Sequence, residues 1–206
     1  MNKTTVLIID DHAVLRMGLA SLINAQKDLS VIGDASCGEE GVRLAATLRP
    51  DVAIVDMMMP EMDGVETTRR LRKSAPRTKV MILTSYGESD GIAHALDAGA
   101  TGAIIKNAKL PELVGAIRTV ATGGKVLSPD IERMLDADPP IPRLSPRQTE
   151  ILRCIVRGFS NPDISKALGI SLPVVKEHVK ALREKIGAAN RAEAVAIATR
   201  KQLLKM

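Results

Sequence analysis

Two hydrophobic patterns alternate along the first 123 residues of the chain. Short apolar runs rich in β-branched side chains are each followed by a segment in which apolar residues recur every three or four positions. The first pattern is typical of strands buried on both faces of a parallel sheet, and the second is typical of helices with one apolar face. Strands are therefore predicted at residues 5–9, 29–32, 52–55, 80–83 and 102–105. The helices after them are predicted near residues 15–23, 38–48, 65–71, 89–98 and 111–122.

This alternation predicts an α/β domain in which helices cover both faces of a five-stranded parallel sheet. Polar side chains stand where the strands end, namely Asp10 and Asp11 after the first, Asp56 after the third, Thr84 after the fourth and Lys106 after the fifth. The flavodoxin-like strand order 2-1-3-4-5 places strands 1 and 3 side by side at the topological switch point, where open α/β sheets bind ligands. We therefore expect these five residues to meet in one cleft.

The residue types in this cleft indicate phosphoryl chemistry. Three crowded carboxylates, Asp10, Asp11 and Asp56, repel one another unless a cation is present, and a few hard oxygen ligands suit Mg²⁺. Lys106 adds a fixed positive charge and Thr84 a hydroxyl donor, so one aspartate can attack a phosphoryl group while its neighbours respond to the new charge. Two structural alternatives remain: Asp56 caps the next helix, and Asp11 caps the first helix in addition to any role at the metal.

Residues 123–143 combine Gly, Pro and acidic residues, and this composition is typical of a connection between domains. Ser128-Pro129 starts a short predicted helix carrying Ile131, Met134 and Leu135, and an extended linker is expected after it. We therefore divide the chain into a first domain at 1–124, a linker at 125–143 and a second domain at 144–206.

The second domain has an entirely helical pattern. Four helices are expected to start at Ser145, Ser160, Ser171 and Asn190 or Arg191, with the last running to about Leu203. Ser145, followed by Pro146 and Gln148, has the form of a capping box. The short turn at 168–171 between the second and third helices is typical of a helix-turn-helix.

The third helix of this domain has one apolar and one charged face. The apolar face is predicted to consist of Val174, Val175, Val179, Leu182 and Ile186, and the outward positions are Lys176, Glu177, Lys180, Arg183 and Glu184. Residues 1–127 carry 15 basic and 15 acidic side chains, whereas residues 143–206 carry 13 and 5, a net charge of +8. This imbalance favours a polyanion-binding surface over a solvated charged face.

Composition excludes several other classes of protein. The chain has one Tyr, one Phe and no Trp, which argues against stacking platforms for single-stranded nucleic acid. Cys37 and Cys154 are far apart and have no further ligands at metal-binding spacing, so we expect buried free thiols. No apolar run approaches the roughly 18 residues of a membrane span, and the polar N-terminus lacks the core of a signal peptide. We expect a cytoplasmic protein that has no membrane partner.

Residues 5–122 resemble the receiver domains of two-component response regulators. The resemblance is carried by Asp10-Asp11, by Asp56 in Asp-x-x-x-Pro-x-Met-Asp-Gly, by Thr84, and by Lys106 after Gly-Ala-x-Gly. It implies that Asp56 accepts phosphate from the phosphohistidine of a sensor histidine kinase, while Thr84 moves toward the phosphate and Lys106 bridges it. One departure is Ala103, because many receivers carry Tyr, Phe or His at this position. Tyr86, two residues after Thr84, is a candidate substitute.

Residues 144–204 resemble the effector domains of the LuxR/NarL/FixJ type, through Leu-Ser-Pro-Arg-Gln-Thr-Glu at the start, Leu-Gly-Ile-Ser in the turn and Val-Lys-Glu-His-Val in the third helix. In that family the third helix is the recognition helix, and the fourth forms the dimer interface. The resemblance places Lys176, Glu177 and Lys180 toward bases or phosphates, and Ser160 and Asn161 near the DNA backbone. Arg183 is a further candidate because it is an outward position of the same helix. Glu177 needs a cytosine amino group as its partner, since it otherwise repels phosphate.

The sequence thus predicts a DNA-binding transcriptional regulator that phosphorylation of Asp56 converts into a homodimer on duplex DNA. A phosphorylation-independent regulator is the main alternative, motivated by Ala103. A phosphoester hydrolase using the same carboxylates and Mg²⁺ is disfavoured because no general acid is evident, and RNA binding is disfavoured by the missing aromatic residues.

Overall fold

The computed structural model describes residues 3–85, 89–137, 140, 144–201 and 203–204. The chain divides into two compact units, Met1–Pro140 and Ile141–Met206. No helix among the described residues is both long enough and apolar enough to cross a membrane.

The first unit is built on a parallel sheet with the strand order β2-β1-β3-β4-β5-β6. Its strands are β1 (Thr4–Ile9), β2 (Leu29–Ala35), β3 (Val52–Asp56), β4 (Lys79–Thr84), β5 (Gly102–Ile105) and β6 (Val126–Leu127). The predicted order 2-1-3-4-5 is confirmed, but the predicted number of five strands is wrong. The sixth strand has only two residues, which pair with Gly102 and Ala103 of β5, and a segment so short carries no recognisable strand pattern.

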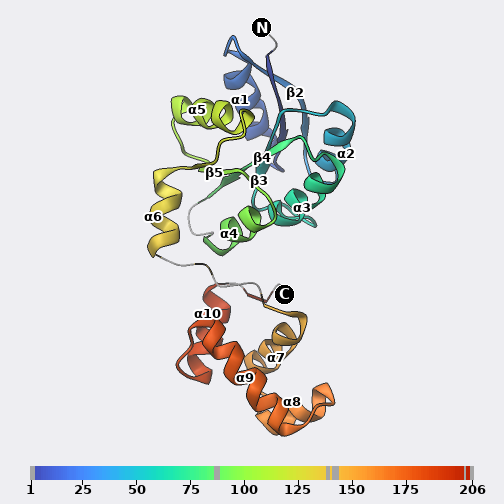
Figure 1. Ribbon diagram of the computed structural model, residues 1–206, viewed down its shortest axis with the longest axis vertical. Coiled ribbons are helices and arrows are strands. Elements are labelled where there is room, and N and C mark those ends of the chain that lie inside the picture. Colours follow the sequence, from blue (N-terminus) through green and yellow to red (C-terminus); the bar gives the residue numbers. More distant parts are fainter. Residues whose placement is uncertain (1–2, 86–88, 138–139, 141–143, 202, 205–206) are drawn as a thin grey trace. The chain divides into compact units, whose positions relative to one another are not determined.

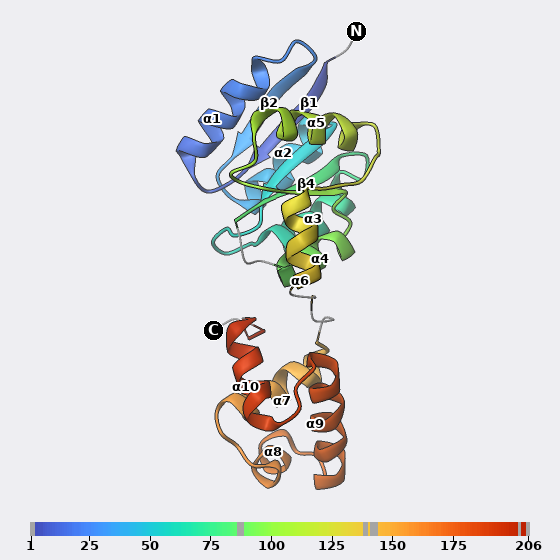
Figure 2. The same ribbon diagram turned by 90° about the vertical axis from the view of Figure 1, so that its left-hand side faces the viewer.

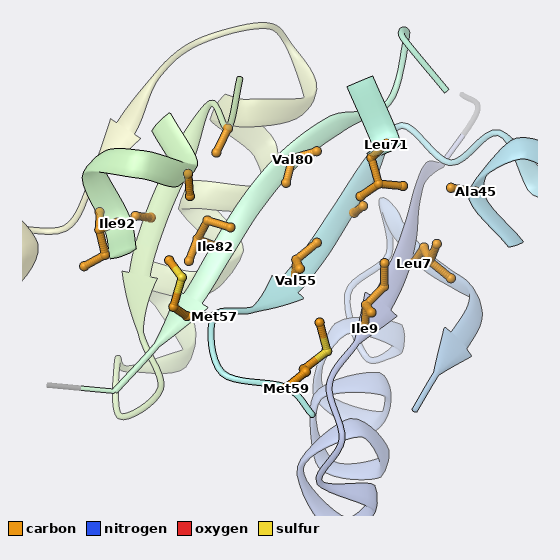
Figure 3. Packing of buried hydrophobic residues seen from close by; sticks show 14 of the residues in the cluster. Leu7, Ile9, Ala45, Val55, Met57, Met59, Leu71, Val80, Ile82 and Ile92 are labelled. Atoms are coloured by element: carbon orange, nitrogen blue, oxygen red, sulfur yellow. The ribbon is translucent and has the colours of Figure 1, made fainter. Parts of the chain in front are cut away.

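Six helices of the described part of this unit cover the two faces of the sheet (Figure 1). They are α1 (Ala13–Asn24), α2 (Gly38–Leu48), α3 (Gly64–Ser74), α4 (Ser89–Asp97), α5 (Leu110–Ala121) and α6 (Pro129–Ala137). One buried cluster joins the sheet to α1 and α5. A second cluster joins the opposite face to α2, α3, α4 and α6, and Figure 3 shows its strand residues Val55 and Ile82 together with Leu71 of α3 and Ile92 of α4.

The segment expected to be a linker contains ordered structure at β6 and α6. The predicted short helix is present, and its Ile131 is fully buried in the same cluster as Ala103 of β5. The backbone N–H of Ser128 donates to the carbonyl of Ala103 at 3.1 Å, which continues the attachment to the sheet. Residues 126–137 therefore pack as part of the first unit, and most of 138–143 lies outside the described residues.

The second unit has four helices in its described residues, namely α7 (Pro146–Val156), α8 (Asn161–Leu168), α9 (Leu172–Ile186) and α10 (Arg191–Arg200) (Figure 2). Ser145 and Gln148 form the predicted capping box, and Ser160 forms a second one with Asp163. Ser171 occupies the N-cap of α9 without a side-chain capping hydrogen bond. All four helices contribute to one apolar core, as the helical pattern predicted, although α10 ends at Arg200 rather than near residue 203.

Candidate functional site

The site lies at the carboxyl end of the sheet, where β3 delivers Asp56. All five residues of β3 are buried, and Asp56 retains only 2% of its accessible surface. The loop after the strand is held close, because the backbone N–H of Gly64 donates to the carbonyl of Met57 at 2.9 Å. A Cβ on Gly64 would lie 2.6 Å from the carbonyl oxygen of Asp56, so only glycine fits here without displacing backbone.

Asp56 does not cap the helix that follows it. That position belongs to Asp63, whose Oδ1 accepts the backbone N–H of Glu66 at 2.8 Å. The carboxylate of Asp56 is instead directed into the site, where its Oδ1 accepts the N–H of Met58 at 3.4 Å. The capping alternative for Asp56 is therefore excluded.

The end of β1 supplies the other two predicted carboxylates. Asp10 is 1% exposed, and the side chain of Asp11 is partly exposed. Ligand atoms of Asp10, Asp11, His12 and Asp56 all lie within 4.8 Å of one another. Asp11 does not cap α1, because the N-cap is His12 and it makes no side-chain capping hydrogen bond. The structure thus brings the predicted acidic trio together and adds an imidazole that the sequence-based prediction omitted.

Lys106 joins the carboxylates of two neighbouring strands. Its Nζ lies 2.7 Å from Oδ2 of Asp56 and 3.0 Å from Oδ2 of Asp10. Its backbone N–H donates to the carbonyl of Thr84 at 2.7 Å, which fixes the end of β5 against the end of β4. The ammonium group therefore lies between the carboxylates of β1 and β3.

The charges in this cluster shift one another's pKa. Burial raises the pKa of the Asp56 carboxyl above its usual range; the contact with Lys106 only partly opposes this effect, and the nearby Asp10 adds to it. Burial also acts to lower the pKa of the Lys106 ammonium, but its contacts with Asp56 and Asp10 outweigh that effect and raise it. Lys106 is thus held positively charged beside a carboxylate that its surroundings only partly stabilise.

Thr84 completes the predicted set at the end of β4. It is fully buried, and its hydroxyl donates to the carbonyl of Ser85 at 3.2 Å. In the register of the sheet it pairs with Ile105, directly before Lys106. Ala103, the position that departs from the receiver pattern, is buried in β5. Tyr86, the suggested substitute, lies outside the described residues.

The acidic cluster has the donors that a divalent cation requires. Oδ2 of Asp10 and Oδ2 of Asp56 are buried against Nζ of Lys106, and the buried Oδ1 of Asp11 accepts no hydrogen bond. One ammonium cannot neutralise three carboxylates, and negative charge that is left in a largely buried cluster is costly unless a further cation compensates it. All three are hard oxygen donors, which are the ligands that Mg²⁺ prefers. The residues present therefore fit the predicted magnesium site.

The predicted DNA surface on α9 is only partly assembled as expected. Lys176, Glu177 and Lys180 are exposed on the same side of the helix. Arg183 is half-buried instead, and its guanidinium donates to the carbonyls of Ala188 and Ala189 in the loop after the helix. Arg183 therefore closes the C-terminal end of α9, a contact that only the path of the following loop reveals.

The remaining predicted DNA residues lie at the start of α8. Ser160 is exposed at the N-cap, where its hydroxyl contacts the carboxylate of Asp163. Asn161 is half-buried and accepts a hydrogen bond from Arg191 at 3.4 Å. The assignment of Val174 to the apolar face of α9 is wrong, because it is 37% exposed. Val175 in the same turn is fully buried, so the apolar face of α9 passes through Val175 and is narrower than predicted.

Comparisons with known proteins agree with this geometry. The family described as "Response regulator receiver domain" matches residues 6–118, and the family "Bacterial regulatory proteins, luxR family" matches residues 142–198. Response regulator protein VraR of Staphylococcus aureus is 34% identical over 204 residues, which cover 97% of this chain and 98% of VraR.

Two solved structures show the same fold over nearly the whole chain. The response regulator ChrA, from a heme-sensing two-component system, is 33% identical with a TM-score of 0.59, and the match covers 99% of this chain and 100% of ChrA. An RcsB–DNA complex is 23% identical with a TM-score of 0.69, and that match covers 97% of this chain and 99% of the RcsB chain. The chain belongs to the response regulators in which a receiver domain precedes a DNA-binding domain of the LuxR family.

Proposed function

We propose that phosphorylation of Asp56, supported by Mg²⁺, controls how this regulator dimerises and binds duplex DNA. The observation that carries the proposal is the position of Lys106, with its Nζ between a buried Asp56 and a buried Asp10. A phosphoryl-transfer site needs a nucleophile with a fixed cation beside it, and Asp56 with Lys106 provides this pair.

The proposed reaction starts from the phosphohistidine of a sensor histidine kinase. A carboxylate oxygen of Asp56 forms a bond to phosphorus while the phosphorus–nitrogen bond breaks, and the bonding electron pair returns to the imidazole of the kinase. The carboxyl must be deprotonated to attack, and Lys106 favours that form against the effect of burial. Bound Mg²⁺, held by Asp10, Asp11 and Asp56, would supply positive charge that neutralises the phosphoryl oxygens.

The new phosphate changes the charge that Asp56 presents to its neighbours. Phosphorylation replaces one negative charge by roughly two and adds acceptor oxygens. Lys106 then has a stronger partner, and the hydroxyl of Thr84 at the adjacent strand end can donate to the phosphate. Thr84 ends β4, which packs against α4 and α5, and Lys106 directly follows β5, which packs against α5 and α6. A state that engages both residues therefore shifts the population of receiver conformations.

The small side chain of Ala103 favours a second function that does not depend on phosphorylation. An aromatic ring at this buried position of β5 would be able to change its rotamer together with Thr84, whereas the methyl group of alanine cannot. Ala103 and Ile131 of α6 belong to the same core cluster, so a structural change in β5 can be transmitted to α6 through direct packing. The two functions differ in whether Asp56 is needed for DNA binding.

The proposed DNA surface centres on Lys176, Glu177 and Lys180 of α9, with the N-terminus of α8 nearby in the helix-turn-helix. Helices of this kind enter the major groove, where lysines neutralise phosphates or bind guanine and a glutamate accepts from cytosine. RcsB, which shares the fold of this chain, has been solved as dimers bound to DNA, and we propose the same assembly on paired half-sites.

The test compares molar mass and DNA affinity with and without a small-molecule phosphodonor in the presence of Mg²⁺. We expect dimers and tighter binding to a selected duplex only for the treated native protein, and no response from Asp56→Asn. The exposed Asp97→Asn is the matched control and should respond as the native protein does. Equal mass and equal affinity for the native protein and Asp56→Asn in every condition would instead establish the phosphorylation-independent function.

A further inference from the structure

His12 stands at the mouth of the acidic cluster and is not used by the phosphoryl chemistry described above. Its side chain is 66% exposed, yet its Nδ1 lies 2.9 Å from Oδ1 of Asp11 and 3.2 Å from Oδ1 of Asp10. The imidazole nitrogen therefore faces into the cluster while the rest of the ring remains in solvent.

The turn before α1 holds His12 in this orientation. Its backbone is extended at the N-cap, and its backbone N–H donates to Oδ1 of Asp10 at 2.8 Å. Arg16 fixes the same turn from the helix, because its guanidinium donates to the carbonyl of Asp10 at 2.7 Å and to Asp34 at 2.9 Å. The position of the ring thus follows from backbone contacts and not from packing of the ring itself.

The spacing of the donor atoms matches a shared metal ion. In octahedral coordination with bonds of about 2.1 Å, adjacent ligand atoms lie about 3.0 Å apart. The separations of Nδ1 from the two carboxylate oxygens are close to that value. The Oδ1 of Asp11 accepts no hydrogen bond although Nδ1 of His12 is 2.9 Å away. The two atoms are therefore close together without hydrogen-bond geometry, as two ligands of one metal ion would be.

The charge balance of the cluster shows independently that a further cation belongs there. Asp10 and Asp56 are 1% and 2% exposed, and Oδ2 of each contacts the same ammonium of Lys106, so one positive charge faces the three carboxylates of Asp10, Asp11 and Asp56. Two negative charges are therefore left uncompensated beside two buried carboxylates that water scarcely reaches, and a divalent cation balances them.

We propose that Nδ1 of His12 is a direct ligand of the metal ion in this site and shifts its selectivity from Mg²⁺ toward first-row transition metals. Carboxylates alone suit Mg²⁺, Ca²⁺ and Mn²⁺, whereas an imidazole ligand favours Co²⁺, Ni²⁺ and Zn²⁺, with affinities that rise along the Irving–Williams order. The neutral ring binds metal through Nδ1 and keeps its proton on Nε2, which the exposure of the ring leaves accessible to water. The inference rests on the proposed metal site, but it requires no phosphorylation.

The rival arrangement is a hydrogen bond from Nδ1–H to Oδ1 of Asp10 at 3.2 Å, with His12 outside the coordination shell. This arrangement predicts no nitrogen ligand and no selectivity for transition metals. The two arrangements therefore differ in a property that spectroscopy detects directly.

The experiment uses the full chain with Mn²⁺ and Co²⁺ as probes at one fixed pH. Pulsed electron paramagnetic resonance of bound Mn²⁺ should show the hyperfine coupling of a directly bound ¹⁴N in the native protein and in His178→Asn, and none in His12→Asn. Competition titrations should show Co²⁺ affinity falling about tenfold or more in His12→Asn, with Mg²⁺ affinity changed by less than about twofold. His178→Asn, which alters a histidine of α9 in the other unit, is the matched control.

The possible failures are distinguishable. Bound Mn²⁺ without nitrogen coupling, or a Co²⁺ affinity that does not respond to His12→Asn, overturns the ligand role of His12 and leaves the magnesium site standing. Failure of the native protein to bind any of the three ions overturns both. Because none of these measurements uses a phosphodonor, none depends on whether Asp56 accepts phosphate.

Discussion

Lys106 and Asp56, far apart in the sequence, meet at 2.7 Å between Nζ and Oδ2 because β5 and β3 both end at the same edge of the sheet. Asp10 shares the ammonium at 3.0 Å, so one cation compensates carboxylates from two strands. A change of either Lys106 or Asp56 should therefore alter the charge balance of the whole site.

Replacing Lys106 by Met should abolish the response to phosphodonor and raise the pKa of Asp56 further, because burial would no longer be opposed by the ammonium. Removing one partner of a buried ion pair typically costs about 3–5 kcal/mol, and protonation of the carboxyls is expected to reduce that cost here. Phosphorylation measured by intact-protein mass spectrometry and stability measured by urea unfolding test this expectation. Lys109→Met, at the exposed N-cap of α5, is the control. A Lys106→Met protein that is phosphorylated normally would show that Lys106 is not needed for the reaction.

Asp56→Asn should stabilise the receiver at neutral pH. The folded-state pKa of Asp56 is raised above the usual value of 3.8, so the folded protein binds more protons than the unfolded chain between those two pKa values. The corresponding contribution to stability is present below pH 3.8 and is lost as pH rises through the folded pKa. The free energy of unfolding of Asp56→Asn should therefore exceed that of the native protein at pH 7, and the gap should narrow as pH falls toward 4. Urea unfolding followed by circular dichroism across this range measures the gap. A gap that widens on acidification would mean that folding lowers the pKa of Asp56 instead of raising it.

Gly64→Ala should disturb the site by moving the backbone that carries Asp56. The added Cβ would meet the carbonyl oxygen of Asp56 at 2.6 Å and Cα of Met57 at 2.9 Å, and neither atom belongs to a flexible side chain. Overpacking of this kind costs about 1–3 kcal/mol. We expect lower thermal stability together with slower phosphorylation. Gly115→Ala in α5 is the matched control, because its Cβ meets nothing within 4 Å and a helical alanine is favoured over glycine by roughly 0.8–1 kcal/mol.

Ile131→Ala should lower the stability of the receiver, because α6 packs into the receiver core. Ile131 is fully buried in the cluster under α4 and β5, and truncation of a buried isoleucine costs about 2–5 kcal/mol. The receiver transition in thermal unfolding should shift downward, while Arg133→Ala, at a side chain that is 76% exposed, should leave it nearly unchanged. An unchanged transition in Ile131→Ala would mean that the receiver ends before α6, near the boundary at 124 that the sequence predicted.

The fold and the receiver site were predictable from the sequence because each rests on a strong local pattern. A strand buried on both faces, such as Val52 to Val55, must be apolar throughout, and a polar residue directly after it must lie at the carboxyl edge of the sheet. The sequence alone therefore predicts that Asp10, Asp56 and Lys106 lie together.

The features that the sequence did not predict depend on contacts that no local pattern records. The strand β6 is too short to show alternation, and its existence depends on pairing with β5. The capping role of Arg183 requires the path of the loop that presents Ala188. For His12 a signal was available, since it directly follows the acidic pair, but the inward direction of its ring depends on the backbone of the turn before α1.

Lys176→Ala and Lys180→Ala should weaken DNA binding through charge, whereas Arg183→Ala should act through stability. Each lysine that contacts a phosphate releases about one counterion, so its loss should reduce the slope of log affinity against log salt by about 1. Arg183 is occupied by the carbonyls of Ala188 and Ala189, so its loss should lower the melting temperature of the second unit and leave the slope nearly unchanged. Fluorescence anisotropy on a labelled duplex at several salt concentrations, with Lys166→Ala on α8 as the control, separates the two effects. A reduced slope for Arg183→Ala without any loss of stability would mean that Arg183 contacts a DNA phosphate.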